Sequence, residues 1–234
     1  MAESVRAALF ARLRERSPAP AEPAEIARAL AAIGYATAAR MPHADLHTAF
    51  IANVLANKGT LELALDRGAA VRAIGRYLYK RFRTHKLVAG NDPRLAAMPW
   101  RDGGVLPRFG AAEPGDAAAL SYARLGVAET GAIVTFTGRA NPGRNNLLPE
   151  DHLVLVNRED VVATLEDAWA KIRLETGAGA WPRGIQFIAG PSSTADVEAQ
   201  LVLGAHGPRR WHVILVGDTP AQDLEQARGE LPEA

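Results

Sequence analysis

Small and hydroxyl-bearing residues that suit anion binding are concentrated in the segment IQFIAGPSSTADVE, residues 185–198. The apolar run Ile185–Ala189 predicts a strand, and the spacing of Ser193 and Asp196 is that of a capping box at a helix start. A helix N-terminus beside the carboxyl end of a strand offers free backbone N–H groups to a carboxylate or phosphate. The alternative is that the hydroxyls only cap the helix. We take as candidate ligand-binding residues Gly190, Pro191, Ser192, Ser193, Thr194 and Asp196.

Glu129 is the first candidate catalytic residue. It lies between apolar residues in GVAETG, residues 126–131, just before the strongly predicted strand Ala132–Thr137. A carboxylate there would be partly desolvated, which suits proton transfer or binding of a substrate hydroxyl. Thr130 and Gly131 would then belong to the ligand site. Alternatively, Glu129 hydrogen-bonds backbone amides and holds the turn.

Two further loops contain candidate residues. The loop NPGRNNLLPEDH, residues 141–152, connects two predicted strands, and Asn145 and Asn146 could bind a polar ligand there. His206 lies in the tight turn LGAHGP, residues 203–208, before the last predicted strand. Because histidine changes charge near neutral pH, we predict His206 as the second catalytic residue. The alternative is a turn histidine bonded to a carbonyl group.

The elements that must position these loops alternate between strands and helices from Gly59 onward. Apolar runs such as Trp211–Val216 suggest strands buried on both faces, so we predict an α/β fold with a three-layer, mostly parallel sheet. Asp116–Leu125 is expected to be a helix. We expect an N-terminal helical appendage (1–57), an α/β domain (58–217) and a polar C-terminal tail (218–234). Lys58 is a candidate binding lysine or an ordinary helix cap, and Arg209 and Arg210 are most simply solvated surface.

The composition narrows the classes of function. The 234 residues include 27 basic and 26 acidic side chains, which gives no electrostatic footprint for nucleic acid. The chain has no cysteine, so it cannot supply thiolate ligands to an iron–sulfur cluster. The six histidines show no metal-binding spacing, so we expect no metal site. No apolar stretch is long enough for a membrane span, and no secretory signal is evident. We therefore expect a cytoplasmic protein.

Five segments in order, GVAETGAIV, NNLLPEDHLVLV, LEDAWAKI, GPSSTADVE and LVLGAHGPRRWHVILV, resemble the LUD-domain family, in particular its lactate-utilisation protein C branch. The resemblance covers roughly Lys58–Val216 and is strongest from Gly126. It implies a fold of the class shared by ribose-phosphate isomerase, glucosamine-phosphate deaminase and CoA transferases, with the N-terminal helices added. It also implies a genetic association with two iron–sulfur oxidoreductase subunits that support oxidation of L-lactate to pyruvate.

From the resemblance we expect a non-cluster subunit or accessory protein of an iron–sulfur lactate-utilisation system. No cofactor is expected on this chain itself, and the clusters would belong to partner subunits. Ser192–Thr194 would bind the carboxylate of a small anionic metabolite. Two alternatives stay open: a stand-alone enzyme acting on an acyl-CoA or sugar phosphate, and a metabolite-sensing regulatory protein. Turnover by the purified chain alone would favour the first alternative, and tight binding without catalysis the second.

Overall fold

The computed structural model describes residues 2–16, 22–34, 45–177, 181–195 and 201–229. The chain divides into two compact units, Met1–Ala38 and Ala39–Ala234. The described part of the first unit contains two helices, α1 (Ala2–Arg16) and α2 (Pro23–Ile33). Pro23 suits the first turn of α2, because its fixed φ is helical and its missing N–H would have no partner there. Both helices were expected from the sequence.

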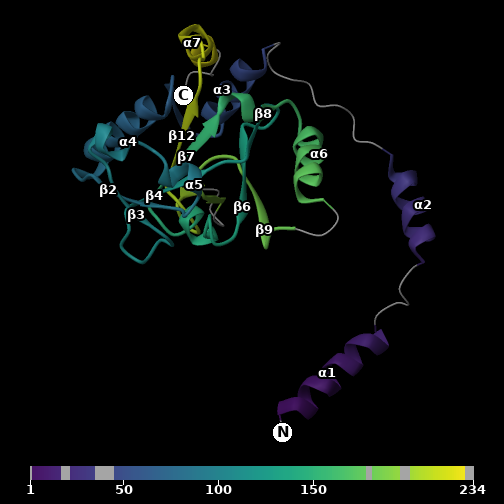
Figure 1. Cartoon of the computed structure of the whole chain (residues 1–234). Coiled ribbons are helices and arrows are strands. Elements are labelled where there is room, and N and C mark those ends of the chain that lie inside the picture. The colour runs from purple at the N-terminus through teal and green to yellow at the C-terminus, as the bar shows by residue number, and fades with distance from the viewer. Residues whose placement is uncertain (1, 17–21, 35–44, 178–180, 196–200, 230–234) are drawn as a thin grey trace. The chain divides into compact units, whose positions relative to one another are not determined.

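The second unit is built on a six-stranded, fully parallel sheet in the order β1-β12-β7-β4-β2-β3 (Figure 1). The central strands are buried almost throughout, as expected for a parallel sheet covered on both faces. This confirms the predicted α/β class with a mostly parallel sheet. The strands are β1 (Thr60–Ala64), β2 (Lys86–Ala89), β3 (Leu106–Phe109), β4 (Ala118–Tyr122), β7 (Asp151–Asn157) and β12 (Arg210–Val216).

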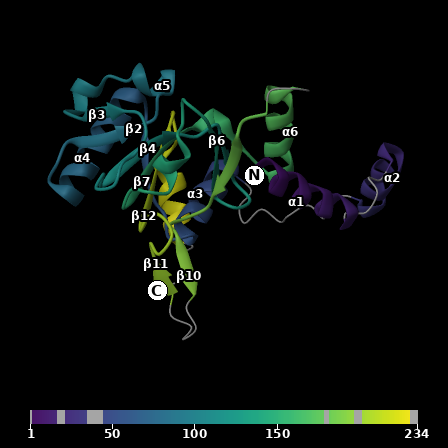
Figure 2. The same cartoon turned by 90° about the horizontal axis from the view of Figure 1, so that it is seen from below.

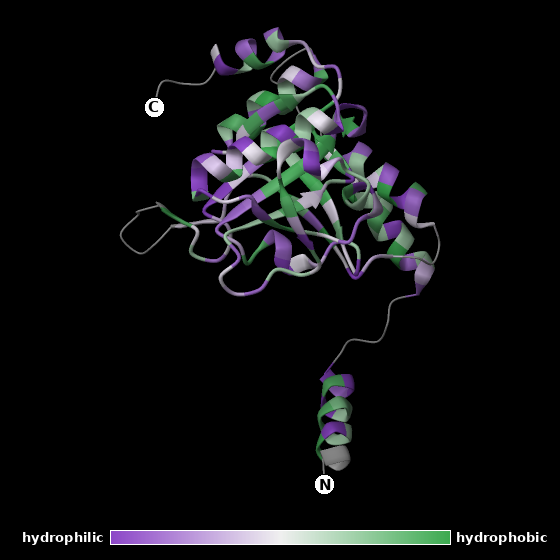
Figure 3. Ribbon diagram, turned by 60° about the vertical axis from the view of Figure 1, so that its left-hand side comes forward, coloured by the Kyte–Doolittle hydropathy of each residue, from purple (hydrophilic) through white to green (hydrophobic). Residues whose placement is uncertain are grey.

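Helices cover both faces of this sheet. The apolar side of α4 (Arg67–Phe82) packs on one face, against side chains of β4, β7 and β12. The opposite face is covered by α3 (Leu46–Ala56) and α7 (Ala221–Gly229), which also contact each other. Figure 3 shows that the central strands are largely hydrophobic, whereas hydrophilic residues are found mainly on the helices and loops around them.

A smaller sheet lies beside α3 on that second face. Its strands, in the order β8-β5-β6-β9, are β5 (Leu125–Val127), β6 (Ala132–Thr137), β8 (Val161–Val162) and β9 (Gly184–Ile188). Helix α6 (Leu165–Thr176) packs on it through Ala168 and Ile172. This helix begins with a capping box formed by Thr164 and Asp167. Remaining short elements are α5 (Pro93–Ala96), the 3₁₀ turns η1 (Trp100–Gly103), η2 (Gly143–Asn146) and η3 (Arg158–Asp160), and the hairpin of β10 (Ser193–Ala195) with β11 (Leu201–Leu203).

Two predicted helices are wrong. The segment 116–125 contains the buried strand β4, because its place inside a parallel sheet overrides the weak strand propensity of its alanines. The expected helix start at Ser193 is strand β10, which pairs antiparallel with β11 and projects from the main sheet (Figure 2). The capping-box interpretation of Ser193 therefore fails, and Asp196 lies outside the described residues.

The ends of the second unit pack more closely than the sequence suggests. We expected α3 to belong to an appendage, yet Phe50, Ile51 and Val54 are fully buried in the core. Residues 221–229 of the expected polar tail form α7, which buries Ala227 in the same cluster. Both helices are therefore part of the layer that covers the parallel sheet.

A chain of buried polar side chains joins the two sheets. Ser121 Oγ donates to Asn146 Oδ1 (2.6 Å), and Asn146 Nδ2 donates to Thr135 Oγ1 (3.0 Å) and Gln186 Oε1 (2.5 Å). His152 Nε2 lies 3.1 Å from Ser121 Oγ. The hydroxyl hydrogen of Ser121 is donated to Asn146, so Ser121 Oγ can only accept from His152. Nε2 of His152 is therefore protonated and donates to Ser121 Oγ. Nδ1 of this neutral ring has no hydrogen-bond partner among the described residues.

This arrangement predicts that the second unit loses stability in mild acid. Burial lowers the pKa of His152 to about 3. Burial also lowers the pKa of His212 to about 4, against the opposing effect of Glu62 and Asp151. An unfolded histidine titrates near pH 6.5, so between about pH 6.5 and 4 the unfolded chain binds more protons than the folded one. The free energy of unfolding should therefore fall as pH is lowered through this window.

The measurement is urea unfolding of wild type and His152→Gln between pH 7 and 4. Glutamine keeps a donor for Ser121 but does not titrate, so its pH slope should be shallower by up to about 1.4 kcal/mol per pH unit. Identical slopes in the two proteins would contradict the assignment of a buried neutral His152.

Candidate anion-binding site

All carboxyl ends of the parallel strands lie at one edge of the sheet. From β2 the chain goes outward to β3, whereas from β4 it goes through the smaller sheet to β7 on the other side. The β2–β4 boundary is therefore a topological switch point, where open α/β sheets leave a crevice for ligands. Parallel pairing of Val88 with Ala119 and Ala89 with Leu120 fixes the two strand ends side by side.

A cavity of about 460 Å³ occupies this position, and we call it the carboxyl-edge crevice. The loop after β2, the end of β4 and the loop after β6 form its walls. Gly90 allows the loop after β2 to contact the loop after β6, because a Cβ at this position would lie only 2.7 Å from the carbonyl oxygen of Ala140. Its charged lining residues are Asp92, Arg94, Arg124 and Arg139, an excess of positive charge.

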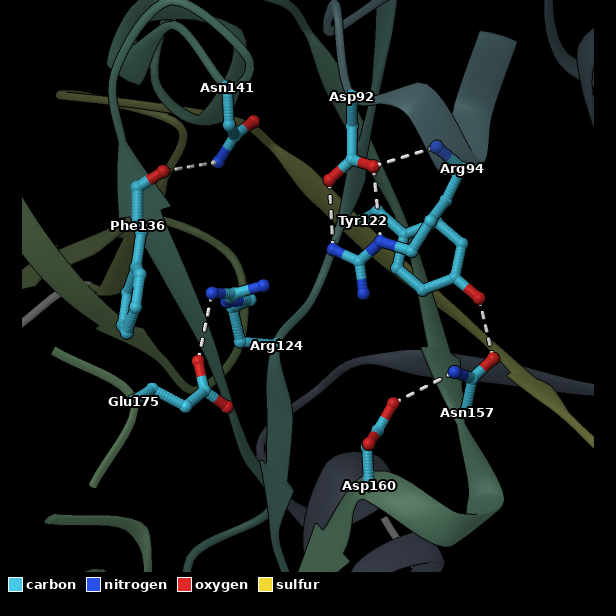
Figure 4. Close-up of polar contacts among 9 residues, drawn as sticks. All are labelled: Asp92, Arg94, Tyr122, Arg124, Phe136, Asn141, Asn157, Asp160 and Glu175. Atoms are coloured by element: carbon cyan, nitrogen blue, oxygen red, sulfur yellow. Dashed lines mark hydrogen bonds and ion pairs between the residues drawn. The ribbon is translucent and has the colours of Figure 1, made fainter. Parts of the chain in front are cut away.

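Arg94 is held rigidly in this crevice (Figure 4). Its Nε and Nη2 atoms donate to the two carboxylate oxygens of Asp92 at 3.0 and 2.8 Å. Its guanidinium carbon lies 4.0 Å from the ring centroid of Tyr122. Burial would raise the pKa of Asp92, but the hydrogen bonds from Arg94 outweigh burial and lower it. The pair is therefore ionised, and Nη1 has no hydrogen-bond partner among the described residues.

Tyr122 and Arg124 extend this arrangement from the end of β4. Burial raises the pKa of Tyr122, so the phenol is neutral and donates to Asn157 Oδ1 at 2.5 Å. Asn157 Nδ2 in turn donates to Asp160 at 2.8 Å. Arg124 lies over the ring of Phe136 at 5.0 Å, and its Nη2 pairs with Glu175 at 2.8 Å (Figure 4). The crevice thus presents oriented guanidinium groups, which suit a carboxylate or phosphate.

The structure uses Glu129 as a helix cap. Its Oε2 accepts a hydrogen bond from the backbone N–H of Leu165, the first residue of α6, at 2.9 Å. Asn53 on α3 donates to the carbonyl oxygens of Ala128 and Glu129, and Asn57 donates to that of Thr130. These contacts match the alternative in which Glu129 holds the turn.

Gly131 and Gly190 both lie against the end of α3. Gly131 has φ +66°, and a Cβ there would lie 2.5 Å from the carbonyl carbon of Asn53. Gly190 has φ +102°, and a Cβ there would lie 2.4 Å from the carbonyl oxygen of Asn57. Antiparallel pairing of Ile133 with Ile188 places the two turns side by side. The two predicted motifs therefore meet, but near the amino end of β1 and not at the carboxyl edge.

Ser192 and His206 also come together. The backbone N–H of His206 donates to Ser192 Oγ at 3.3 Å, and the N–H of Ser192 donates to the carbonyl of Pro208. His206 is exposed, whereas Pro191 lines a separate cavity. Thr194 lies on β10 with Ser193. The helix N-terminus that motivated a ligand role for this loop is not present, because Ser193–Ala195 is a strand. The ligand role itself remains a prediction.

Asn145 and Asn146 point into the protein. Asn145 Oδ1 accepts from the N–H of Ala112 at 2.6 Å, and its Nδ2 donates to the carbonyl of Gly110 at 2.9 Å. Asn146 belongs to the buried chain between the sheets. Since their amides are used by the protein, these two residues contribute to packing in this structure.

Sequence reasoning missed the residues of the carboxyl-edge crevice. The turn residues Gly90-Asn91-Asp92-Pro93, which follow β2, are the sequence feature that could have pointed to Asp92 and Arg94. Tyr122 and Arg124 were hidden inside the wrongly predicted helix. Among the described residues, no group of three or more histidine, aspartate or glutamate side chains is arranged to hold a metal ion. Nor is any described helix both long and apolar enough to cross a membrane.

The structure is that of an α/β protein with an arginine-lined crevice at the switch point of a parallel sheet. Residues 117–216 match the family model described as the LUD domain. Several curated relatives bear the name lactate utilization protein C, and three of them show the range of similarity. The match to that of Shouchella clausii is 34% identical over 42% of this chain and 43% of the relative. The Exiguobacterium protein is 30% identical over 61% and 66%, respectively, and the Bacillus subtilis protein is 33% identical over 42% of each.

The chain belongs to the LUD-domain family. The match spans less than half the length of the first relative. Among solved structures, a DUF162 family protein from Deinococcus radiodurans aligns with a TM-score of 0.48 and 19% sequence identity, over 74% of this chain and 96% of that protein.

The cap on α6 generates a prediction about Glu129. Glu129→Ala should lower the free energy of unfolding by about 1–2 kcal/mol, because the N–H of Leu165 loses its acceptor. Glu129→Gln retains a side-chain oxygen and should lose less. Urea unfolding measures both variants, with Glu159→Ala as an exposed control. Full stability of the alanine variant together with loss of ligand binding would instead favour the catalytic role.

Proposed function

We propose that this protein is a component without its own redox centre of an iron–sulfur lactate-utilisation system, and that it binds the carboxylate of a small metabolite in the carboxyl-edge crevice. The lactate assignment is supported by the relatives named lactate utilization protein C. The division of labour is supported by the absence of cysteine from the sequence. Oxidation of lactate to pyruvate releases two electrons and two protons, and clusters on partner subunits would take the electrons.

The observation that carries the ligand proposal is the fixed guanidinium of Arg94. Two of its nitrogens are held by Asp92 and its face is covered by Tyr122. A carboxylate entering the crevice would meet Nη1 without Arg94 having to lose rotamer freedom, so little entropy would be lost on binding. Arg139 supplies further positive charge on the same cavity, whereas the charge of Arg124 is shared with Glu175.

We expect pyruvate or L-lactate to raise the melting temperature of the wild-type chain by mass action. Arg94→Gln should weaken binding about tenfold or more, because a charge-assisted hydrogen bond to an anion contributes about 1.5–3 kcal/mol. Arg139→Gln changes an exposed side chain that leaves no buried partner, so it tests the site without endangering the fold. Isothermal titration calorimetry gives the affinities.

The matched control is Arg173→Gln on the exposed side of α6, which should bind as wild type does. Equal affinity in wild type and in both crevice variants would refute the ligand site. The system-level proposal has a separate test: lactate oxidation should require addition of iron–sulfur partner subunits. Turnover of lactate by the purified chain alone would contradict it.

A further inference from the structure

A second basic cavity lies at the opposite, amino-terminal edge of the parallel sheet. Its volume is about 530 Å³, and we call it the amino-edge pocket. Residues just before β1, β7 and β12 meet there with the loop after β9. Its lining includes Lys58, Glu150, Pro191, Leu203, Arg209 and Trp211.

Positive charge exceeds negative charge in this pocket. Glu150 is its one acidic lining residue among those described, and it is already shared: Oε1 lies 3.5 Å from Arg81 Nη2 and 4.0 Å from Arg210 Nη1. Lys58 and Arg209 have no ion-pair partner among the described residues. Two cations from separate chain segments are therefore available to one anionic group.

The backbone of Lys58 adopts a left-handed conformation, which is uncommon for a residue other than glycine. Helix α3 ends in a Schellman motif, in which the N–H of Gly59 donates to the carbonyl of Val54 and that of Lys58 donates to Leu55. Lys58 occupies the left-handed position of this motif at φ +62°, where glycine or asparagine is usual. Gly59 packs under Trp211, since a Cβ there would lie 2.7 Å from the indole ring. The turn therefore fixes the lysine backbone at the rim of the pocket.

We propose that the amino-edge pocket is a second binding site, and that its ligand is a phosphate-bearing small molecule with an apolar or aromatic body. Lys58 and Arg209 bind the phosphate, because a dianion is best matched by more than one cation. Pro191 and Leu203 supply the apolar wall that contacts the remainder of the ligand, and Trp211 lines the pocket as an almost fully buried ring. The site is independent of the carboxyl-edge crevice, which lies at the opposite edge of the same sheet, at the ends of β2 and β4.

The test is calorimetric titration of the full chain with adenosine monophosphate and with inorganic phosphate at low ionic strength. Adenosine monophosphate should bind more tightly than inorganic phosphate. Lys58→Asn and Arg209→Gln should each weaken its binding about tenfold or more. Arg94→Gln should leave this binding unchanged, which separates it from the proposed crevice ligand. Lys80→Asn, on the exposed side of α4, is the control for nonspecific charge effects.

Lys58→Asn is informative because asparagine suits the left-handed backbone. Its melting temperature should equal or exceed that of wild type, so lost binding cannot be ascribed to unfolding. Unchanged affinity in Lys58→Asn and Arg209→Gln would overturn the proposal. An equal loss in Lys80→Asn would overturn it as well, because the attraction would then be a general charge effect.

Discussion

The common direction of the six central strands is the constraint on which the rest of this structure depends. Register between β7 and β12 runs from Asp151 opposite Arg210 to Asn157 opposite Val216, without interruption. One edge of the sheet therefore collects every strand start and the other collects every strand end. Because both faces are covered by helices and by the smaller sheet, both proposed ligand sites lie at these two edges.

Parallel pairing also requires long crossover connections, and these determine what each edge contains. Helix α4 connects β1 to β2 and leaves the turn Gly90–Asp92 at the carboxyl edge. The smaller sheet connects β4 to β7, and its strand β6 brings Phe136 and Arg139 to the same place. The crevice is therefore assembled from segments far apart in the sequence, and no single motif describes it.

The end of α3 organises the segments by which the family is recognised. Asn53 and Asn57 donate to carbonyl oxygens of the turn that contains Glu129, and Gly131 and Gly190 lie against the same helical turn. These glycines are needed because a Cβ would collide with helix backbone, and both have positive φ. The sequence motifs thus record close packing as much as chemistry, which explains why they identify the family without identifying its ligand.

The strands that could be predicted from the sequence are those with a strong local pattern of apolar residues and turn residues. Strand β6 was predicted with its observed bounds, because it is an apolar run ended by a glycine-containing turn. Strand β4 was missed, since Ala118–Tyr122 is alanine-rich and only burial between neighbouring strands makes it extended. Ser193 fitted a capping box by spacing, but pairing with β11 decided its conformation. Local spacing cannot reveal such a nonlocal partner.

The crevice could not be predicted from the sequence for a related reason. Basic and acidic side chains are almost equal in number over the whole chain, so the composition does not reveal a local excess of arginine. With 27 basic and 26 acidic side chains, the composition gives no sign of anion binding. The decisive feature is the ion pair between Asp92 and Arg94, whose Oδ2 and Nη2 atoms lie 2.8 Å apart. The carboxylate orients the guanidinium group, and the pair as a whole has little net charge. Such a pair attracts an anion weakly at long range, yet it presents a remaining donor in a fixed direction. Selectivity at this edge should therefore come from hydrogen-bond alignment, which persists at salt concentrations that screen exposed charges.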